Sequence, residues 1–208
     1  FALRRMRITY FRMRHFRFSL LLVSVLAAAS AASAQPSEPA AAPATQASPE
    51  ARLAGLFDSL KRERDPDKAR GIASQILAEW DDSGSATVNL LMQWATKAAN
   101  EKRNAAALDF LDQATILKPD YAEVWNRRAG LHFTMGDRRK AMADINQVLI
   151  REPRHFGALS GLAGILAENG QDELALKAWQ RYLTVYPADR EAQEAAIKLE
   201  EKLAGSRT

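Results

Sequence analysis

Cysteine is missing from all 208 residues of this chain. Its absence excludes a disulfide framework, a thiolate metal site and a lipid-modified cysteine at the start of a mature chain. Long apolar runs are missing as well. The most apolar stretch, FSLLLVSVLAAAS, has a core of roughly a dozen residues, whereas a membrane-spanning helix needs about 20.

Acidic residues are missing before residue 35, where six arginines stand. This basic block, the short apolar stretch and the small residues Ala32-Ser33-Ala34 together predict a secretory signal peptide over residues 1–34. We expect cleavage after Ala34, so that the mature chain begins at Gln35 and is periplasmic. An uncleaved N-terminal membrane anchor is the alternative.

Beyond residue 34 the basic excess disappears, because 23 basic residues face 25 acidic ones. A basic protein would suggest a nucleic-acid partner, but this mature chain carries a net charge of −2 and does not. We therefore expect no nucleic-acid partner and no stable membrane insertion after cleavage. Residues 35–50 read QPSEPAAAPATQASPE, which has four prolines and no hydrophobic face, and they predict a disordered linker.

Catalytic and metal-binding signatures are missing too. The three histidines, His15, His132 and His155, are widely spaced and do not predict converging metal ligands. There is no glycine-rich phosphate loop, and Ser160 lacks the second glycine of a nucleophile elbow. The sequence therefore predicts a protein that is not an enzyme and that needs no cofactor and no metal.

A repeat of 34 residues is present. Three rows can be aligned, here named row 1 (88–121), row 2 (122–155) and row 3 (156–189). Position four of each row is large and apolar. Positions eight, twenty and thirty-two are invariant, being alanine, alanine and proline: Ala95, Ala129 and Ala163; Ala107, Ala141 and Ala175; Pro119, Pro153 and Pro187.

Each row predicts two helices joined by a short turn. The alanines are expected where the two helices cross, since only a small side chain lets the backbones approach. The proline is expected to end the second helix, because it lacks an amide donor and disfavours helical geometry in the residue before it.

This pattern resembles the tetratricopeptide repeat (TPR), with Trp125, Ala129, Ala141 and Pro153 of row 2 at the family's spacing. His132 departs from it, since an aromatic residue is usual there. The resemblance implies an all-α fold: a right-handed α-solenoid of antiparallel helix pairs with a concave face. It also identifies the chain as similar to secreted bacterial TPR-containing proteins.

The segments that flank the rows are predicted to be caps. Residues 51–87 offer a degenerate helix pair, with Ala69 at position twenty but Phe57 in the small eighth position, and we interpret them as an N-terminal cap. Residues 190–208 predict a polar helix with a narrow apolar stripe, followed by a tail, which would cover the other end of the solenoid.

In the family that the rows resemble, ligands usually lie along the concave face, at positions two, five, nine, twelve and thirteen of each first helix. No lysine or arginine occupies these positions, so the resemblance implies a small, nearly uncharged groove with room for a peptide backbone or a helix. The expected groove residues are Asn89, Met92, Thr96, Asn100, Glu123, Asn126, Phe133, Thr134, Ser160 and Glu168.

The function expected from the sequence is a non-enzymatic scaffold or adaptor of the bacterial envelope. Its partner would be another envelope protein, which contributes a peptide or helix to the concave groove. An accessory subunit of an enzyme that builds or remodels the cell wall is the alternative. The sequence does not indicate an oligomeric state.

Overall fold

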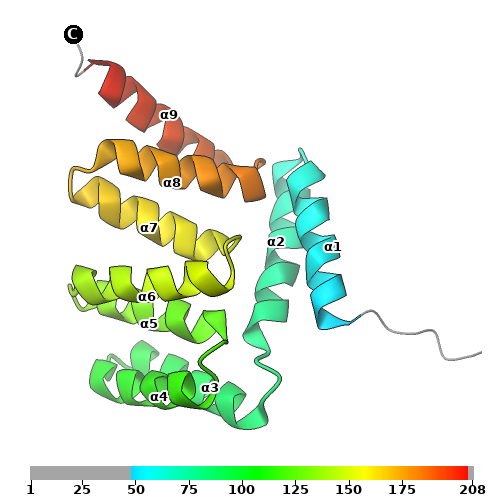
Figure 1. Ribbon diagram of the computed structural model, residues 1–208, viewed down its shortest axis with the longest axis vertical. Helices are drawn as coiled ribbons and strands as arrows, with labels where there is room; N and C mark the ends of the chain where they lie inside the picture. The colour runs from blue at the N-terminus through cyan, green and yellow to red at the C-terminus, as the bar shows by residue number, and fades with distance from the viewer. Residues whose placement is uncertain (1–47, 206–208) are drawn as a thin grey trace, which may run out of the picture. The chain divides into compact units, whose positions relative to one another are not determined.

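The computed structural model describes residues 48–205, and these form nine α-helices with no strand among them. The all-α class is therefore confirmed. The signal peptide expected over 1–34, most of the linker expected over 35–50 and the last three residues of the tail lie outside the described residues. In chain order the helices are α1 (Pro49–Arg62), α2 (Pro66–Asp81), α3 (Ala86–Asn100), α4 (Asn104–Leu117), α5 (Ala122–Thr134), α6 (Arg138–Arg151), α7 (Phe156–Glu168), α8 (Asp172–Val185) and α9 (Arg190–Gly205) (Figure 1).

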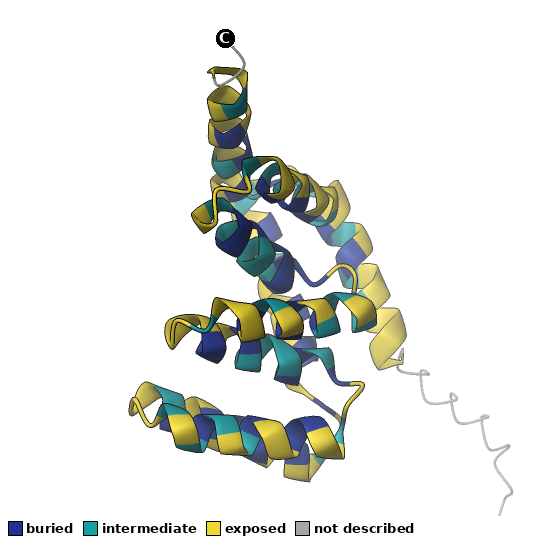
Figure 2. Cartoon of the chain, turned by 60° about the vertical axis from the view of Figure 1, so that its left-hand side comes forward, coloured by how far each residue is buried: buried dark blue, intermediate teal, exposed yellow. Residues whose placement is uncertain are grey.

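The three rows form three stacked helix pairs, α3 with α4, α5 with α6, and α7 with α8 (Figure 1). The second helix of each row ends two residues before the row's proline. The buried sides of paired helices are turned toward one another, and the exposed sides face outward (Figure 2). The crossing points are closely packed, because six alanines there are at most 3% exposed: Ala95, Ala107, Ala129, Ala141, Ala163 and Ala175.

The turn between the two helices of a row needs a left-handed backbone at position fifteen. Glycine provides it in rows 2 and 3, where Gly136 and Gly170 have φ of 81° and 71°. Row 1 has Lys102 at the same position, with φ of 57°. A residue with a Cβ is strained there by roughly 1–2 kcal/mol, so row 1 has the least favourable of the three turns.

Helix α9 covers the last row. It packs on α8 with the apolar stripe that the sequence suggested, in which Ala192, Ala196 and Leu199 are buried. Its other sides carry charged residues, and Lys202 pairs with Asp172 of α8 at 2.8 Å. The arrangement is an α-solenoid of antiparallel helix pairs with a C-terminal capping helix.

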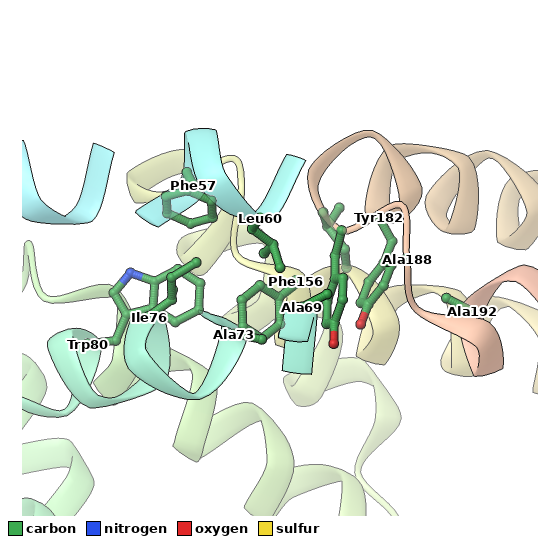
Figure 3. Close-up of a cluster of buried hydrophobic side chains, with 12 residues drawn as sticks. Phe57, Leu60, Ala69, Ala73, Ile76, Trp80, Phe156, Tyr182, Ala188 and Ala192 are labelled. Atoms are coloured by element: carbon green, nitrogen blue, oxygen red, sulfur yellow. The ribbon is translucent and has the colours of Figure 1, made fainter. Parts of the chain in front are cut away.

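The N-terminal helix pair differs from its expected position. The sequence suggested a cap on row 1 over residues 51–87, but Phe57, Leu60 and Trp80 are buried together with Phe156 and Tyr182 of row 3 (Figure 3). Helix α1 begins at Pro49, inside the range expected for the linker. The physical reason is aromatic packing: Trp80 of α2 stacks on His155 and packs against Phe156 at the start of row 3.

The N-terminal helices α1 and α2 also contact residues of the turns that connect the rows. The Tyr121 hydroxyl, between rows 1 and 2, donates to the Trp80 carbonyl oxygen at 2.6 Å. The Arg154 guanidinium, between rows 2 and 3, lies 4.0 Å from the centre of the Phe57 ring. Because α2 follows these turns, its C-terminal end comes beside the first helices of rows 1 and 2.

Candidate functional site

Three neighbouring depressions follow the first helices of the rows. The first, of about 750 Å³, lies between the end of α2 and α3. The second, of about 450 Å³, lies between α3 and α5, and the third, of about 550 Å³, between α5 and α7. We call these three depressions together the groove. Apart from the end of α2, its walls are the first helices of the rows, on which the resemblance places ligands.

Arg127 of α5 is the one residue that lines all three depressions. Its Nε donates to Oε1 of Glu123 at 3.0 Å, and its Nη1 donates to the Thr96 hydroxyl at 2.9 Å. Its Nη2 pairs with the carboxylate of Asp81, at the last position of α2. The guanidinium therefore joins rows 1 and 2 to the N-terminal helix pair at the centre of the groove.

The Glu123 carboxylate lies beneath this arginine, and the residue is only 8% exposed. It also accepts hydrogen bonds from Nδ2 of Asn126 at 3.0 Å and from Nε2 of His155 at 3.2 Å. Burial alone would raise the Glu123 pKa, but the hydrogen bonds from His155 and Arg127 and the positive charge of Arg127 outweigh it and hold the pKa below its ordinary value. Glu123 is therefore an ionised structural partner and is not available to a ligand.

His155 is fully buried and is the last residue of row 2, directly before α7. Its Nδ1 accepts a hydrogen bond from the amide of Ala158 at 3.1 Å, which caps α7. Since Nδ1 is an acceptor, the ring N–H is on Nε2, and it donates a hydrogen bond to Glu123. The ring lies flat on Trp80 of α2. One histidine thus connects row 3, row 2 and the N-terminal pair.

Asn89 supports the turn that leads into row 1. Its Oδ1 accepts from the amide and the hydroxyl of Ser83, at 2.9 Å and 2.6 Å. Its Nδ2 donates to Asp82 at 2.8 Å. Asn89 therefore lies at the edge of the first depression as part of a closed hydrogen-bond network.

The structure brings most of the expected groove residues together. Met92 is buried and forms part of the floor of the first depression. Glu123 and Glu168 line none of the three depressions, because Glu123 is buried and Glu168 pairs with Arg138 at 2.8 Å. The eight that line the groove are Asn89, Met92, Thr96, Asn100, Asn126, Phe133, Thr134 and Ser160.

The expectation of a nearly uncharged groove is wrong. Arg127 at position six and Lys97 at position ten line it, and both fall outside the positions that the resemblance supplied. Asp81 was not among the expected groove residues for another reason. Nothing in the sequence of α2 indicates that the C-terminal end of this helix reaches the groove. The expected room for a peptide backbone is present at two glycines of the groove, since a Cβ at Gly130 or Gly164 would meet no atom within 4 Å.

The described residues offer little else that binds or reacts. Within residues 48–205, no group of three or more histidine, cysteine, aspartate or glutamate side chains is arranged to hold a metal ion. None of the helices in this range is both long enough and apolar enough to span a bilayer. His132 is buried beside Asp144, with 3.8 Å between Nε2 and Oδ2.

Comparisons with solved structures place the fold. The first TPR of Spaghetti (RPAP3), bound to an HSP90 peptide, aligns with a TM-score of 0.54 and 21% identity over 58% of this chain and 95% of that one. The Sgt2 TPR domain from Aspergillus fumigatus gives 0.54 and 17% identity over 59% of this chain and 83% of its own. A tetratricopeptide repeat protein from Parabacteroides merdae gives 0.53 and 20% identity over 73% and 61%.

Sequence comparison adds a nearer relative. No family model matches the chain. A TPR repeat-containing protein of Rhizobium etli is 68% identical over 161 residues, which cover 77% of this chain and 79% of the relative. Together with the three rows and their buried alanines, this identity shows that the chain belongs to the family of tetratricopeptide-repeat proteins.

Proposed function

We propose that this protein is a non-enzymatic scaffold of the bacterial envelope that binds an extended segment of another envelope protein in the groove. TPR arrays generally serve as scaffolds for protein–protein interaction. The observation that supports the proposal is the continuity of the three depressions along α3, α5 and α7, with Arg127 common to all of them.

The groove has the chemistry that an extended peptide needs. Gly130 and Gly164 leave open space beside the helix backbones, so a peptide main chain can come close. Phe133 is 39% exposed and offers an apolar contact. Asn100 is exposed at the junction of the first two depressions and provides both a donor and an acceptor. The RPAP3 domain of similar fold is bound to the HSP90 peptide SRMEEVD, which supports the binding of a peptide here.

The location in the envelope rests on the sequence of residues 1–34. Six arginines, a short apolar stretch and a small-residue site give the pattern of a cleaved signal. N-terminal sequencing of the protein from envelope material tests this, with Gln35 as the expected first residue. Recovery of the uncleaved chain from the membrane pellet would contradict it. No feature of residues 48–205 favours the alternative of an accessory subunit for a cell-wall enzyme.

Site-specific photocrosslinking in living cells tests the groove. A photoreactive residue replaces Asn100 in the groove or, as a matched control, Ile150 of α6, which is 73% exposed and lines none of the depressions. We expect a crosslinked partner peptide from position 100 and not from position 150. The peptide is then synthesised and titrated into the purified protein. Crosslinks from position 150 alone, or no binding of the synthetic peptide, would overturn the proposal.

A further inference from the structure

The stack has an uncovered apolar end at row 1. Leu90 and Trp94 of α3 are 41% and 46% exposed. Trp94 packs against Phe110 of α4, with 5.6 Å between the ring centroids. Leu117, near the end of α4, is 58% exposed. We call Leu90, Trp94, Phe110 and Leu117 the end patch. Monomeric proteins rarely expose a contiguous patch of several large apolar side chains without a partner for it.

The equivalent residues of rows 2 and 3 show what positions three and seven of a row contact. Leu90 is at position three of its row, and the same position in rows 2 and 3 is Val124, 0% exposed, and Ala158, 1% exposed. Trp94 is at position seven, where row 2 has Arg128, which donates from Nη1 to Asp112 of row 1 at 2.7 Å. These positions therefore form the contact with the preceding row. In row 1 they are the same contact surface without its partner.

The helix pair that precedes row 1 does not supply that partner. Its large apolar side chains, Phe57, Leu60, Ile76 and Trp80, are buried against row 3 instead. The opposite end of the stack does not match either, since the outer side of α9 carries exposed charges such as Glu194 and Lys198. Among the described residues, the surface that best complements the end patch is the end patch itself.

We propose that two copies of this chain associate through their end patches, face to face, about a two-fold axis that runs parallel to α3 and α4. Such an axis brings α3 of one copy over α4 of the other, as α5 lies over α4 within the chain. Trp94 of each copy then meets Phe110 and Leu117 of the other. Isologous contacts of this kind are the commonest way in which identical chains pair.

The charges on this face fit the same axis. Lys97 is one turn beyond Trp94 on α3, and Glu101 caps the end of the helix away from Leu90, where it pairs with Arg103 at 2.6 Å. An axis parallel to the helices places the apolar half of each copy opposite the apolar half of the other, and the charged ends opposite each other. An axis across the helices would instead place apolar side chains against charges. The arrangement of charge therefore selects one of the two face-to-face pairings.

The size of the face predicts how strong the pairing is. Helix α3 has 15 residues, so at about 1.5 Å per residue and about 10 Å per helix diameter the two-helix face covers roughly 450 Å². Two such faces give about 900 Å², below the roughly 1,600 Å² of a standard stable interface. The dimer is therefore reversible and depends on protein concentration.

Sedimentation velocity over a dilution series of the full chain tests the proposal. We expect a monomer–dimer equilibrium in the wild type and a dissociation constant at least about tenfold higher for Trp94→Glu, since aromatic residues dominate small interfaces. Ile197→Glu is the matched control, because Ile197 is 52% exposed on α9 at the other end. It should leave the equilibrium unchanged, and circular dichroism melting should show both variants folded.

Every other outcome contradicts the pairing. A monomer at all concentrations means that the end patch does not bind a second copy. If acrylamide quenching of the wild-type monomer also shows Trp94 to be protected, another part of the chain covers the patch. A dimer that Ile197→Glu disrupts is head-to-tail, and a dimer that Trp94→Glu leaves intact uses another surface.

Discussion

Trp80 and His155 stack with their ring centroids 4.1 Å apart and their planes within 4°. One ring belongs to the N-terminal helix pair and the other to the turn before row 3. Phe156 packs against the same tryptophan at 5.1 Å. This contact fixes the N-terminal pair along the edge of the solenoid, and it places Asp81, the residue after Trp80, beside Arg127 in the groove.

Replacing Trp80 with alanine should release the N-terminal pair. The loss of a buried aromatic side chain typically costs about 3–5 kcal/mol, because a cavity remains. We expect a lower midpoint of chemical denaturation and faster hydrogen exchange in α1 and α2 than in α5 to α8. Trp94→Ala is the control at an exposed tryptophan, and at low protein concentration it should change stability little. Equal effects of the two substitutions would show that the stack is not what holds the pair.

Replacing Lys102 with glycine should stabilise the protein. Lys102 has φ of 57° where rows 2 and 3 have glycine. Glycine removes the steric strain, although it adds freedom to the unfolded chain, so we expect a net gain of roughly 0.5–1 kcal/mol in the free energy of unfolding. The reverse change, Gly136→Lys, should lower it by a similar amount. Urea titrations of both variants measure this, and a loss of stability in Lys102→Gly would show that the turn is not strained.

Ala141→Leu should overpack the crossing of α5 and α6. Ala141 is 0% exposed, and a larger side chain there forces the helices apart at about 1–3 kcal/mol. Since each row is stabilised by packing against its neighbours, amide hydrogen exchange should become faster in rows 1 and 3 as well as in row 2. Ala143→Leu, on the exposed side of the same helix, is the control. A melting temperature unchanged to within a degree would contradict the close crossing.

The stack of rows was predictable from the sequence because its determinants are local and repeated. Alanine at positions eight and twenty and proline at thirty-two recur in all three rows, so each row supports the interpretation of the others. The N-terminal pair carries the same helix signals without a repeat. Its docking depends on Phe57 and Trp80 meeting Phe156, which lies about 75 to 100 residues away, and no local pattern encodes that pairing.

The groove was predictable only in part, because some of its residues are placed by contacts between segments far apart in the sequence. Eight expected residues line it, because helix positions map directly onto a concave face. Glu123 was placed on that face as well, but it is buried under Arg127 and bonded to His155, which lies in the turn 32 residues further along the chain. Arg127 is at position six, outside the positions that the resemblance supplied, and its partner Asp81 reaches the groove only through the docking of α2.

Acid should weaken the protein through Glu123. Its folded-state pKa is held below the ordinary glutamate value of about 4.3. The carboxylate therefore stabilises the fold fully above that pH, and the contribution disappears as the pH falls through the lower folded-state pKa. At pH 7, Glu123→Gln should cost about 1.5–3 kcal/mol, as expected for hydrogen bonds to a charged group.

The pH dependence distinguishes this effect from simple damage to the core. The difference in the free energy of unfolding between wild type and Glu123→Gln should shrink as the pH is lowered below about 4.3. Glu194→Gln, at an exposed position of α9, is the control and should match the wild type at every pH. A difference between Glu123→Gln and the wild type that stays constant down to the acid transition would show that the ionised carboxylate is not the cause.

Substitutions within the groove should weaken binding of the partner segment identified by crosslinking, and Phe133→Ala should do so with little change in folding. Phe133 is 39% exposed, so Phe133→Ala removes an apolar contact for the ligand and little of the core. Asn126 is partly exposed in the third depression and can hydrogen-bond an extended backbone. The loss of one such bond costs about 0.5–1.5 kcal/mol, which is a severalfold weaker affinity. Ile150→Ala, outside the groove, should bind like the wild type in titration calorimetry. If Ile150→Ala abolishes binding while both groove variants keep full affinity, the partner lies on the outer surface of the second helices.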